Sequence, residues 1–437
     1  MGEKQIIQSD KERTILIGGE IKGNASLLKT EDSLQELAML ADTAGMEVVG
    51  QVTQRMQRID PNTFIGSGKV LEVKEEVSQA NAQVVIFDDE LSPRHQRQLE
   101  KEFGENIKVL DRSALILDIF AQHAHTREGA LQVELAQYEY RLPRLTRQWT
   151  HLARQAGGGA SRGGTGGVGL RGPGETQLEV DKREIGRKIS KLKSELEHVR
   201  QHRSQHRRQR NRTGVPIVAL VGYTNAGKST LLRTITGADV YVADQLFATL
   251  DPLTRRVELP SGRSILMTDT VGFIQKLPTS LIAAFRATLE EILEADLLLH
   301  VVDISHPNAL EHVETVEDTL AEIDMPNIPR ILVWNKVDKW SSSELPQRIG
   351  KERYNAEIAL SAQNGSGIIE LLDSINDVLS SYMKRVKLYI PYQRGEVVSQ
   401  LFEKANIEKQ EHTENGVILT VQLPSSLLER FKQFRIE

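Results

Sequence analysis

The stretch that most constrains this chain is VPIVALVGYTNAGKSTLLR, residues 215–233. An apolar run of strand length leads into Gly222-x-x-x-x-Gly227-Lys228-Ser229, and a helical sequence follows at once. This strand–loop–helix order is the setting in which a phosphate-binding loop is credible. The glycines let main-chain N–H groups surround phosphate oxygens, and the start of the helix adds its positive end. We expect Lys228 to reach the β- and γ-phosphates and Ser229 to bind Mg²⁺ through its hydroxyl.

Two later segments indicate how a γ-phosphate would be sensed. SILMTDTVG ends a predicted strand with Asp269, which can hold the Mg²⁺ shell, and Gly272 then offers a main-chain N–H to the γ-phosphate. DQLFATLDPLTRR, residues 244–256, lies between this segment and the first loop. A threonine there would close over Mg²⁺ and the γ-phosphate. Thr249 is the expected residue and Thr254 the alternative, unless Thr249 is simply a surface threonine.

Two further segments indicate the base. RILVWNKVD ends another predicted strand with Asn335, Lys336 and Asp338. A carboxylate at this place can accept both the N1–H and the 2-amino group of guanine. Adenine would leave that carboxylate unpaired, so the pattern favours guanine. EIALSA then brings Ser361 and Ala362 to the other edge of the base.

These segments together form the predicted nucleotide site. Its residues are Gly222, Tyr223, Thr224, Asn225, Ala226, Gly227, Lys228, Ser229, Thr230, Phe247, Ala248, Thr249, Leu250, Asp251, Asp269, Thr270, Val271, Gly272, Asn335, Lys336, Val337, Asp338, Ser361, Ala362 and Gln363. Lys228, Thr249 and Gly272 are the predicted catalytic residues. Ser229 and Thr249 are the predicted Mg²⁺ ligands.

The order GYTNAGKS, FATLD, DTVGF, NKVD and SA resembles the translation-associated branch of the P-loop GTPases. TFIGSGKVLEV, DDELSPRHQRQLE, DRSALILDIFAQHA and RGPGETQLEVDKREI resemble the HflX family over most of residues 14–380. The resemblance implies a GTPase that binds the large (50S) ribosomal subunit and its 23S rRNA. It also implies that the protein splits stalled or idle 70S ribosomes.

Phe273 raises a question about catalysis, because many GTP-hydrolysing switches have a water-orienting glutamine after this glycine. Phenylalanine can neither donate nor accept a side-chain hydrogen bond. We therefore expect slow hydrolysis that a partner stimulates, and the resemblance makes the ribosome that partner. In several relatives of this branch, a P-loop asparagine helps to bind K⁺. Asn225 has the matching position, so it either supports K⁺-dependent hydrolysis or merely tolerates a tight turn.

The predicted fold class is multidomain α/β. Apolar and amphipathic runs alternate over residues 14–125, which indicates a small parallel α/β domain ending in a helical pair. The predicted domains are residues 1–156, a glycine-rich loop and basic long helix over 157–212, the P-loop GTPase domain over 213–383, and a small α+β domain over 384–437.

A candidate RNA contact lies between these domains. Residues 157–174 contain ten glycines in eighteen, which suits a loop, and 181–212 carry twelve Lys/Arg and four Asp/Glu. That local charge of +8 contrasts with −5 for the whole chain, so the helix is either an RNA-binding face or a solvated one. The predicted RNA-binding residues are Arg162, Arg171, Arg200, Arg203, Arg207, Arg208 and Arg210.

FIGSGKV, residues 64–70, contains two glycines and a lysine near a helix start but lacks the full P-loop spacing. Some HflX relatives are described as handling ATP through this domain, so the stretch is either a second nucleotide site, for ATP, or a simple turn. Asp88, Asp89 and Glu90 could suggest a metal site. They are more typical of a helix start before Ser92-Pro93.

The rest of the composition indicates the cellular compartment. There are no cysteines, the N-terminus is polar, and no apolar run approaches the ~20 residues that span a bilayer, so we expect a cytoplasmic protein without a membrane span. Nothing in the sequence requires more than a monomer.

Two other functions stay open. One is a ribosome assembly or storage factor whose RNA affinity GTP toggles, and the other is an ATP-driven RNA remodeller.

Overall fold

The computed structural model describes residues 11–23, 29–104, 106–145, 177–213, 215–237, 246–247, 252–276, 292–322, 328–342, 344–346, 351–381, 383–424, 428 and 430–436. The chain divides into two compact units. The first contains residues 1–198 together with two short later segments, 244–250 and 275–286. The second contains residues 199–243, 251–274 and 287–437.

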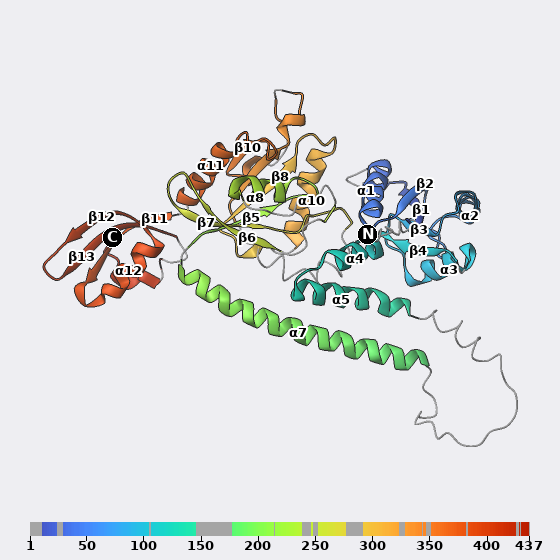
Figure 1. The fold of residues 1–437 in the computed structure, drawn as a ribbon, viewed down its shortest axis with the longest axis horizontal. Coiled ribbons are helices and arrows are strands. Elements are labelled where there is room, and N and C mark those ends of the chain that lie inside the picture. Colours follow the sequence, from blue (N-terminus) through green and yellow to red (C-terminus); the bar gives the residue numbers. More distant parts are fainter. Residues whose placement is uncertain are drawn as a thin grey trace, which may run out of the picture. The chain divides into compact units, whose positions relative to one another are not determined.

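The first unit is built on a four-stranded parallel sheet in the order β2-β1-β3-β4 (Figure 1). Its strands are β1 (Arg13–Ile21), β2 (Glu47–Met56), β3 (Val84–Phe87) and β4 (Lys108–Asp111). Its helices are α1 (Thr30–Thr43), α2 (Ser67–Ala80), α3 (Pro93–Phe103), α4 (Arg112–His123) and α5 (Arg127–Arg141), followed by the short η1 (Leu142–Arg144). Parallel strands need crossover connections, and the alternation of apolar and amphipathic runs supplies them. The predicted parallel α/β domain is confirmed.

Helix starts in this unit follow from local sequence. Ser92 caps α3, because its hydroxyl accepts a hydrogen bond from the N–H of His95 at 3.1 Å and Pro93 occupies the first turn. Asp111 ends β4 and at once caps α4 by accepting from the N–H of Ala114 at 2.8 Å. The chain therefore passes from β4 into α4 without a loop.

The long helix α7 (Gln177–Thr213) runs beside α5 over its first half (Figure 1). Leu192 and Leu196 of α7 form a buried cluster with Leu135 of α5, and Ile189 packs against it. Lys193 of α7 adds an ion pair with Glu139 at 2.8 Å. Ile189, Leu192 and Leu196 recur at intervals of three and four residues, which is the spacing of a helix that packs on a partner helix. The helix continues through the basic stretch to Thr213.

The second unit contains a six-stranded sheet in the order β10-β9-β8-β5-β7-β6, parallel except for β6. Its strands are β5 (Ile217–Val221), β6 (Leu253–Glu258), β7 (Ser264–Asp269), β8 (Leu297–Asp303), β9 (Arg330–Asn335) and β10 (Ala356–Ala359). Its helices are α8 (Lys228–Thr236), α10 (Ala309–Glu322) and α11 (Ile368–Ser381), with short turns η2 (Val337–Lys339) and η3 (Lys351–Arg353). The carboxyl ends of β5, β7, β8 and β9 share one edge of the sheet, which is where parallel α/β sheets bind ligands.

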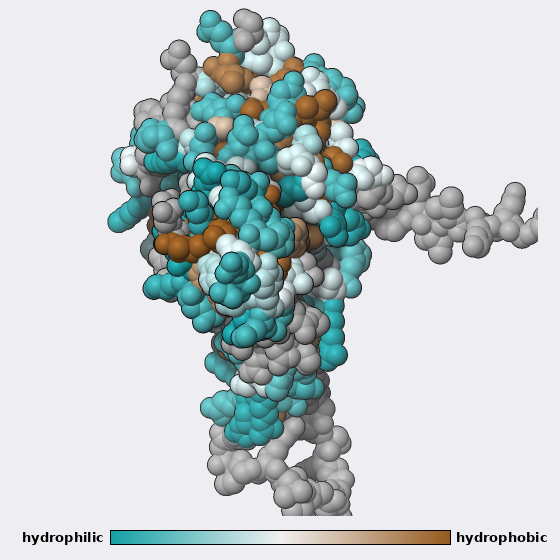
Figure 2. All heavy atoms as spheres, turned by 90° about the vertical axis from the view of Figure 1, so that its left-hand side faces the viewer, coloured by the Kyte–Doolittle hydropathy of each residue, from teal (hydrophilic) through white to brown (hydrophobic). Residues whose placement is uncertain are grey.

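A three-stranded antiparallel sheet follows in the order β11-β13-β12. It comprises β11 (Met383–Pro391), β12 (Asn406–His412) and β13 (Gly416–Pro424), with α12 (Gly395–Lys404) and the short η4 (Tyr392–Arg394) and η5 (Lys432–Phe434). Leu388, Leu401 and Leu419 are buried in its own core. The surface seen from this end is mostly hydrophilic, with hydrophobic residues in small groups (Figure 2). None of the helices in the described part of the chain combines the length and hydrophobicity that crossing a bilayer requires.

Candidate nucleotide-binding site

The loop between β5 and α8 has the conformation that its glycines require. Gly227 has φ = 92° and precedes Lys228, the first residue of α8. A Cβ on Gly227 would lie 2.3 Å from Nδ2 of Asn335, so no other residue fits without displacing the Asn335 side chain. Asn225 also has a left-handed φ of 58°, which asparagine tolerates better than most side chains. The loop therefore packs directly against the end of β9.

Lys228 lies at the base of this loop and is almost completely buried. Its ammonium group donates to the main-chain oxygens of Gly222, at 3.0 Å, and Tyr223, at 2.9 Å. Burial lowers the pKa of Lys228 to about 8, and the nearby Asp269 partly opposes that shift. An anionic phosphate beside this amine would restore its charge, which is the electrostatic task of a P-loop lysine.

Ser229 and Asp269 form the part of the site that fits Mg²⁺. The Ser229 hydroxyl donates to an Asp269 carboxylate oxygen at 2.6 Å, and Asp269 is fully buried at the end of β7. Among the described residues no group of three or more His, Asp or Glu side chains could hold a metal by itself. Mg²⁺ is usually held by one or two protein oxygens together with substrate phosphates, so one hydroxyl and one carboxylate fit the ion well.

The loop after β7 is fixed to the P-loop through its main chain. Phe273 donates its N–H to the oxygen of Gly222 at 3.1 Å and accepts from the N–H of Thr224 at 2.8 Å. Gly272 is so close that a Cβ would lie 2.9 Å from Cα of Thr224 and 3.1 Å from Nζ of Lys228. The hydroxyl of Thr270 donates to Leu220 of β5 at 2.6 Å. The loop that carries DTVGF thus lies against the P-loop and its lysine.

The side chain of Phe273 is 3% exposed. Its main chain is paired with the P-loop on both sides, so this side chain has neither the chemistry nor the freedom to position a water. Thr224 places a buried hydroxyl in the same loop, and none of the described residues hydrogen-bonds to it. A phosphate oxygen is a suitable partner for that hydroxyl.

Asn335 holds together the part of the site that is predicted to bind the guanine base. Its Nδ2 donates to the main-chain oxygen of Ala226 in the P-loop, and its Oδ1 accepts from the N–H of Ala362, both at 2.9 Å. The side chain is 1% exposed. The hydroxyl of Thr234 in α8 also donates to the oxygen of Ala362 at 2.6 Å. One amide therefore joins three predicted segments, the P-loop, NKVD and SA.

Asp338 and Ser361 meet at the same end of the sheet, where the Ser361 hydroxyl donates to the carboxylate. Ser361 is buried and Asp338 is exposed, as a carboxylate that receives an incoming base should be.

Lys336 has φ = 64°, and its ammonium group lies 2.7 Å from a carboxylate oxygen of Asp303. Val337 lies in η2 and Gln363 is exposed. Thr230 follows in the first turn of α8, and Val271 lies between Thr270 and Gly272.

Two residues near the site were not predicted from the sequence. Asp303 ends β8, and its position at the carboxyl end of a parallel strand was an available signal. His312 of α10 stacks on the P-loop side chain Tyr223, with ring centroids 3.8 Å apart and an angle of 4°. Burial and the neighbouring His306 lower the pKa of His312 to about 3. A single histidine on an amphipathic helix gives no sequence signal for this contact.

Some predicted residues lie outside the described part of the chain. These are Ala248, Thr249, Leu250, Asp251, Arg162 and Arg171. Helix α7 contains five more of the predicted residues, of which the structure describes only the backbone. These residues are Arg200, Arg203, Arg207, Arg208 and Arg210. Of the predicted segment around Thr249, Leu246 and Phe247 are described. Both are buried, and Phe247 contacts Phe120 of α4 edge-to-face at 4.6 Å.

The FIGSGKV stretch forms the start of α2, with Gly66 at the N-cap. Lys69 pairs with Glu72 on the same helix at 2.7 Å. Of the three neighbouring acids, Asp88 and Asp89 both accept from the ammonium group of Lys276. Asp88 is buried, while Glu90 is exposed and lies 3.8 Å from Arg144. The helix-start interpretation of these acids agrees with the Ser92 cap, and the ATP interpretation of FIGSGKV stays a prediction.

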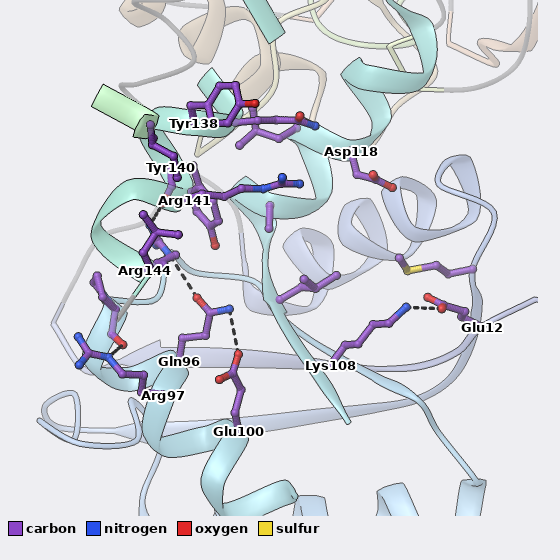
Figure 3. Close-up of a pocket in the computed structure, with 18 residues that line it drawn as sticks. Glu12, Gln96, Arg97, Glu100, Lys108, Asp118, Tyr138, Tyr140, Arg141 and Arg144 are labelled. Atoms are coloured by element: carbon purple, nitrogen blue, oxygen red, sulfur yellow. Dashed lines mark hydrogen bonds and ion pairs between the residues drawn. The ribbon is translucent and has the colours of Figure 1, made fainter. Parts of the chain in front are cut away.

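The first unit also contains a cavity of about 700 Å³ between α3, β4, α4 and α5 (Figure 3). Basic side chains line it, and Lys108 and Arg144 among them have local partners. Lys108 pairs with Glu12, and Arg144 donates to Gln96 at 3.2 Å and to the main-chain oxygen of Leu91 at 2.6 Å. The Arg144 guanidinium also stacks on Tyr140, 3.6 Å from the ring centroid. These contacts stabilise the packing of η1 and α5 and do not define a ligand.

The geometry of the second unit defines a class. A phosphate-binding loop, a buried lysine, a serine–aspartate pair suited to Mg²⁺ and a carboxylate at the base end together describe a P-loop GTPase.

Comparison with protein families agrees over four consecutive regions. Residues 31–121 match the model "GTP-binding GTPase N-terminal" and residues 123–210 match "GTP-binding GTPase Middle Region". Residues 217–336 match "50S ribosome-binding GTPase" and residues 345–430 match "HflX C-terminal domain". GTPase HflX of Caldanaerobacter subterraneus subsp. tengcongensis is 43% identical, over 98% of this chain and 94% of that protein. GTPase HflX of Escherichia coli (strain K12) is 45% identical, over 91% of each. The chain belongs to the HflX family of GTPases.

Among solved structures, the chain is similar to a GTP-binding protein from Sulfolobus solfataricus in complex with GDP. The match has 23% identity and a TM-score of 0.44, and it covers 85% of this chain and 99% of that one.

Proposed function

We propose that this GTPase binds the large ribosomal subunit in its GTP form, separates the subunits of 70S ribosomes, and leaves after hydrolysis that the ribosome stimulates. The observation that carries the proposal is the position of Phe273. A buried aromatic side chain stands where a water-orienting glutamine would be useful, and its main chain is fixed to the P-loop. The missing group must therefore come from elsewhere, and an outside partner can add roughly 10⁵-fold to a GTPase rate. The family model that matches residues 217–336 is described as a 50S ribosome-binding GTPase, which supports the choice of partner.

The chemistry at the site is assigned to named residues. Lys228 and the P-loop N–H groups bind the phosphates, and Gly272 presents its N–H to the γ-phosphate. Asp338, with Ser361 and Ala362, binds guanine. Mg²⁺ neutralises phosphate charge when it is bound, and Ser229 with Thr249 would hold it.

We also propose that Asn225 supports K⁺-dependent hydrolysis. Its left-handed φ of 58° is equally what a tight turn requires, so the same turnover assay is run in K⁺ and in Na⁺ buffer. Equal rates in the two buffers would leave Asn225 with the turn role alone.

The test of subunit separation uses purified 70S ribosomes and a non-hydrolysable GTP analogue, followed by sedimentation. We expect free 50S and 30S subunits with the analogue and intact 70S with GDP. Ribosomes that stay intact, together with binding only to free or immature subunits, would favour the assembly or storage factor instead. An ATP-driven remodeller would hydrolyse ATP even after Lys228→Ala, which should abolish GTP hydrolysis.

The basic half of α7 and the glycine-rich segment before it are the proposed RNA contacts. Replacing Arg207, Arg208 and Arg210 with glutamine removes three positive charges from a helix of local net charge +8. Ribosome binding should weaken, and the dependence of its affinity on salt should flatten, because fewer counterions are released. Unchanged binding would assign α7 to a solvated face.

A further inference from the structure

Two segments bordering the predicted nucleotide site belong to the first compact unit. They are residues 244–250, which contain Phe247, and residues 275–286, which begin two positions after Phe273. In both, the described residues contact α4 or the strand end beside it. Two segments that border the predicted nucleotide site thus belong to the same compact unit as α4.

The second segment meets a buried cluster of charges. Arg112, the first residue of α4, is 1% exposed and forms ion pairs at 2.7 Å with Asp88 and with Glu36. We call these three side chains the Arg112 cluster. Two carboxylates here face a single guanidinium, and Lys276 adds a second positive charge by donating to Asp88 at 2.5 Å and to Asp89 at 2.6 Å.

Asp88 depends on positive charge from both Arg112 and Lys276. Burial raises the pKa of Asp88, but Arg112 and Lys276 outweigh that effect and hold the pKa below its usual value. A buried carboxylate that loses one of its cations is strongly disfavoured. Arg112 also donates to the main-chain oxygen of Gln275 at 3.4 Å, so the cluster contacts both the main chain and the side chain of the segment.

The backbone supports a functional interpretation. Six non-glycine residues of the described chain have positive φ, and four of them are Asn225, Phe247, Lys276 and Lys336, which lie in or beside the nucleotide motifs. Phe247 and Lys276 have φ of 58° and 56°, a conformation that bulky or long side chains rarely adopt. Such strain persists where surrounding contacts over-determine it, and it concentrates at switch regions. In both cases the surrounding contacts include α4 or the Arg112 cluster.

Chain connectivity links these contacts to the phosphates. Phe273 is fixed to the P-loop through two main-chain hydrogen bonds, and Lys276 follows only three residues later. Three residues span at most about 10 Å, so only a short piece of chain separates DTVGF from the ion pairs of Lys276. Phe120, two turns along α4 from Arg112, contacts the other segment through Phe247.

We propose that α4, through the Arg112 cluster and Phe120, senses which guanine nucleotide is bound and passes that state to the N-terminal α/β domain. The γ-phosphate orders the loops that contain Phe247 and DTVGF, and their contacts with α4 change with it. Linkage is reciprocal, so a partner that binds the N-terminal domain alters the preference for GTP over GDP. The inference rests on the GTP cycle proposed above.

The experiment compares hydrogen exchange in α4 and β3 of the full chain with GDP and with a non-hydrolysable GTP analogue. Lys276→Met removes the charge and keeps the length of the side chain, and Lys276→Arg keeps the charge. Lys108→Met is the control that removes a lysine from an exposed ion pair, Lys108–Glu12, elsewhere in the same unit. Nucleotide affinities and GTP turnover are measured on the same samples. They report whether the GTP cycle itself operates.

We expect exchange in α4 to differ between the two nucleotides in the parent, Lys276→Arg and Lys108→Met proteins, and not in Lys276→Met. The ratio of affinities for the analogue and GDP should shift about fivefold in Lys276→Met, at the low end of ordinary coupling. A parent protein that binds and hydrolyses GTP but shows the same exchange in α4 with both nucleotides would overturn the inference. So would a nucleotide effect that survives Lys276→Met.

Discussion

The side-chain amide of Asn335 lies between Ala226 of the P-loop and Ala362 of the SA motif and forms a hydrogen bond of 2.9 Å with each. Three segments that are far apart in the sequence therefore depend on one buried side chain. The P-loop and the loop predicted to contact the base are connected at this point, because the same residue holds both.

Asn335→Ala should destabilise the protein and weaken nucleotide binding together. The substitution leaves the oxygen of Ala226 and the N–H of Ala362 without their buried partner, at a cost of about 2–4 kcal/mol. Thermal unfolding and titration with a fluorescent GDP would measure the two effects. Asn376→Ala is the matched control, because Asn376 is only partly buried and its side-chain oxygen accepts an exposed hydrogen bond from the hydroxyl of Ser261. Equal behaviour of the two variants would show that Asn335 has no such role.

Asp338→Asn should exchange the preferred base. The amide cannot accept from both guanine N–H groups, and the loss of about 3 kcal/mol lowers the affinity for GDP about 100-fold. Xanthine carries an oxygen where guanine has its amino group, so xanthosine diphosphate should bind the variant better than it binds the parent. Competition binding with both nucleotides tests this. Undiminished GDP binding would remove Asp338 from the base site.

Phe273→Gln should not create a faster enzyme. The side chain at this position is buried and its main chain is paired with Gly222 and Thr224, so the new amide cannot reach a water near the γ-phosphate. It would instead place a polar group in an apolar site, with a loss of stability of about 2–4 kcal/mol. Single-turnover hydrolysis without ribosomes is the measurement. A tenfold increase in that rate would show that the missing glutamine alone limits hydrolysis.

Acid should destabilise the second unit partly through His312. Its pKa is about 3 in the folded protein and near 6.5 in an unfolded chain, so the unfolded chain binds the additional proton between those values. Stability from this group is therefore present above about pH 6.5 and falls as the pH decreases, by about 2 kcal/mol between pH 7 and pH 5. His312→Phe keeps the stack on Tyr223 and removes the titration. Its unfolding temperature should fall less than that of the parent over this pH range, and parallel curves would contradict the assignment.

Contiguous motifs were the part of the site that the sequence could predict. Asp269 and Asn335 stand at strand ends, because a buried apolar run places the next polar residue at the edge of the sheet. Lys228 begins the helix that follows the glycine-containing loop after β5, and the spacing of that loop motif predicts its place. Pairs formed between elements were not predictable in the same way. The contact of Lys336 with Asp303 depends on β8 and β9 being neighbours, and that of Tyr223 with His312 depends on where α10 packs.

The fold shows the same division. The alternating apolar and amphipathic runs predict the parallel α/β sheet of the first unit. No such pattern predicts β12. Its sequence, NIEKQEH, is polar on both faces after Ile407, and it forms a strand because β13 supplies hydrogen-bond partners. The assignment of residues 244–250 and 275–286 to the first unit also depends on tertiary contacts that no local pattern encodes.

The most direct test of the account is GTP turnover by the purified protein, alone and with 50S subunits, in K⁺ buffer. Lys228→Ala serves as the control for contaminating activity. The account predicts a low basal rate that rises steeply with added 50S, because Phe273 cannot supply the group that hydrolysis lacks. A rate that stays flat as 50S is added would contradict it.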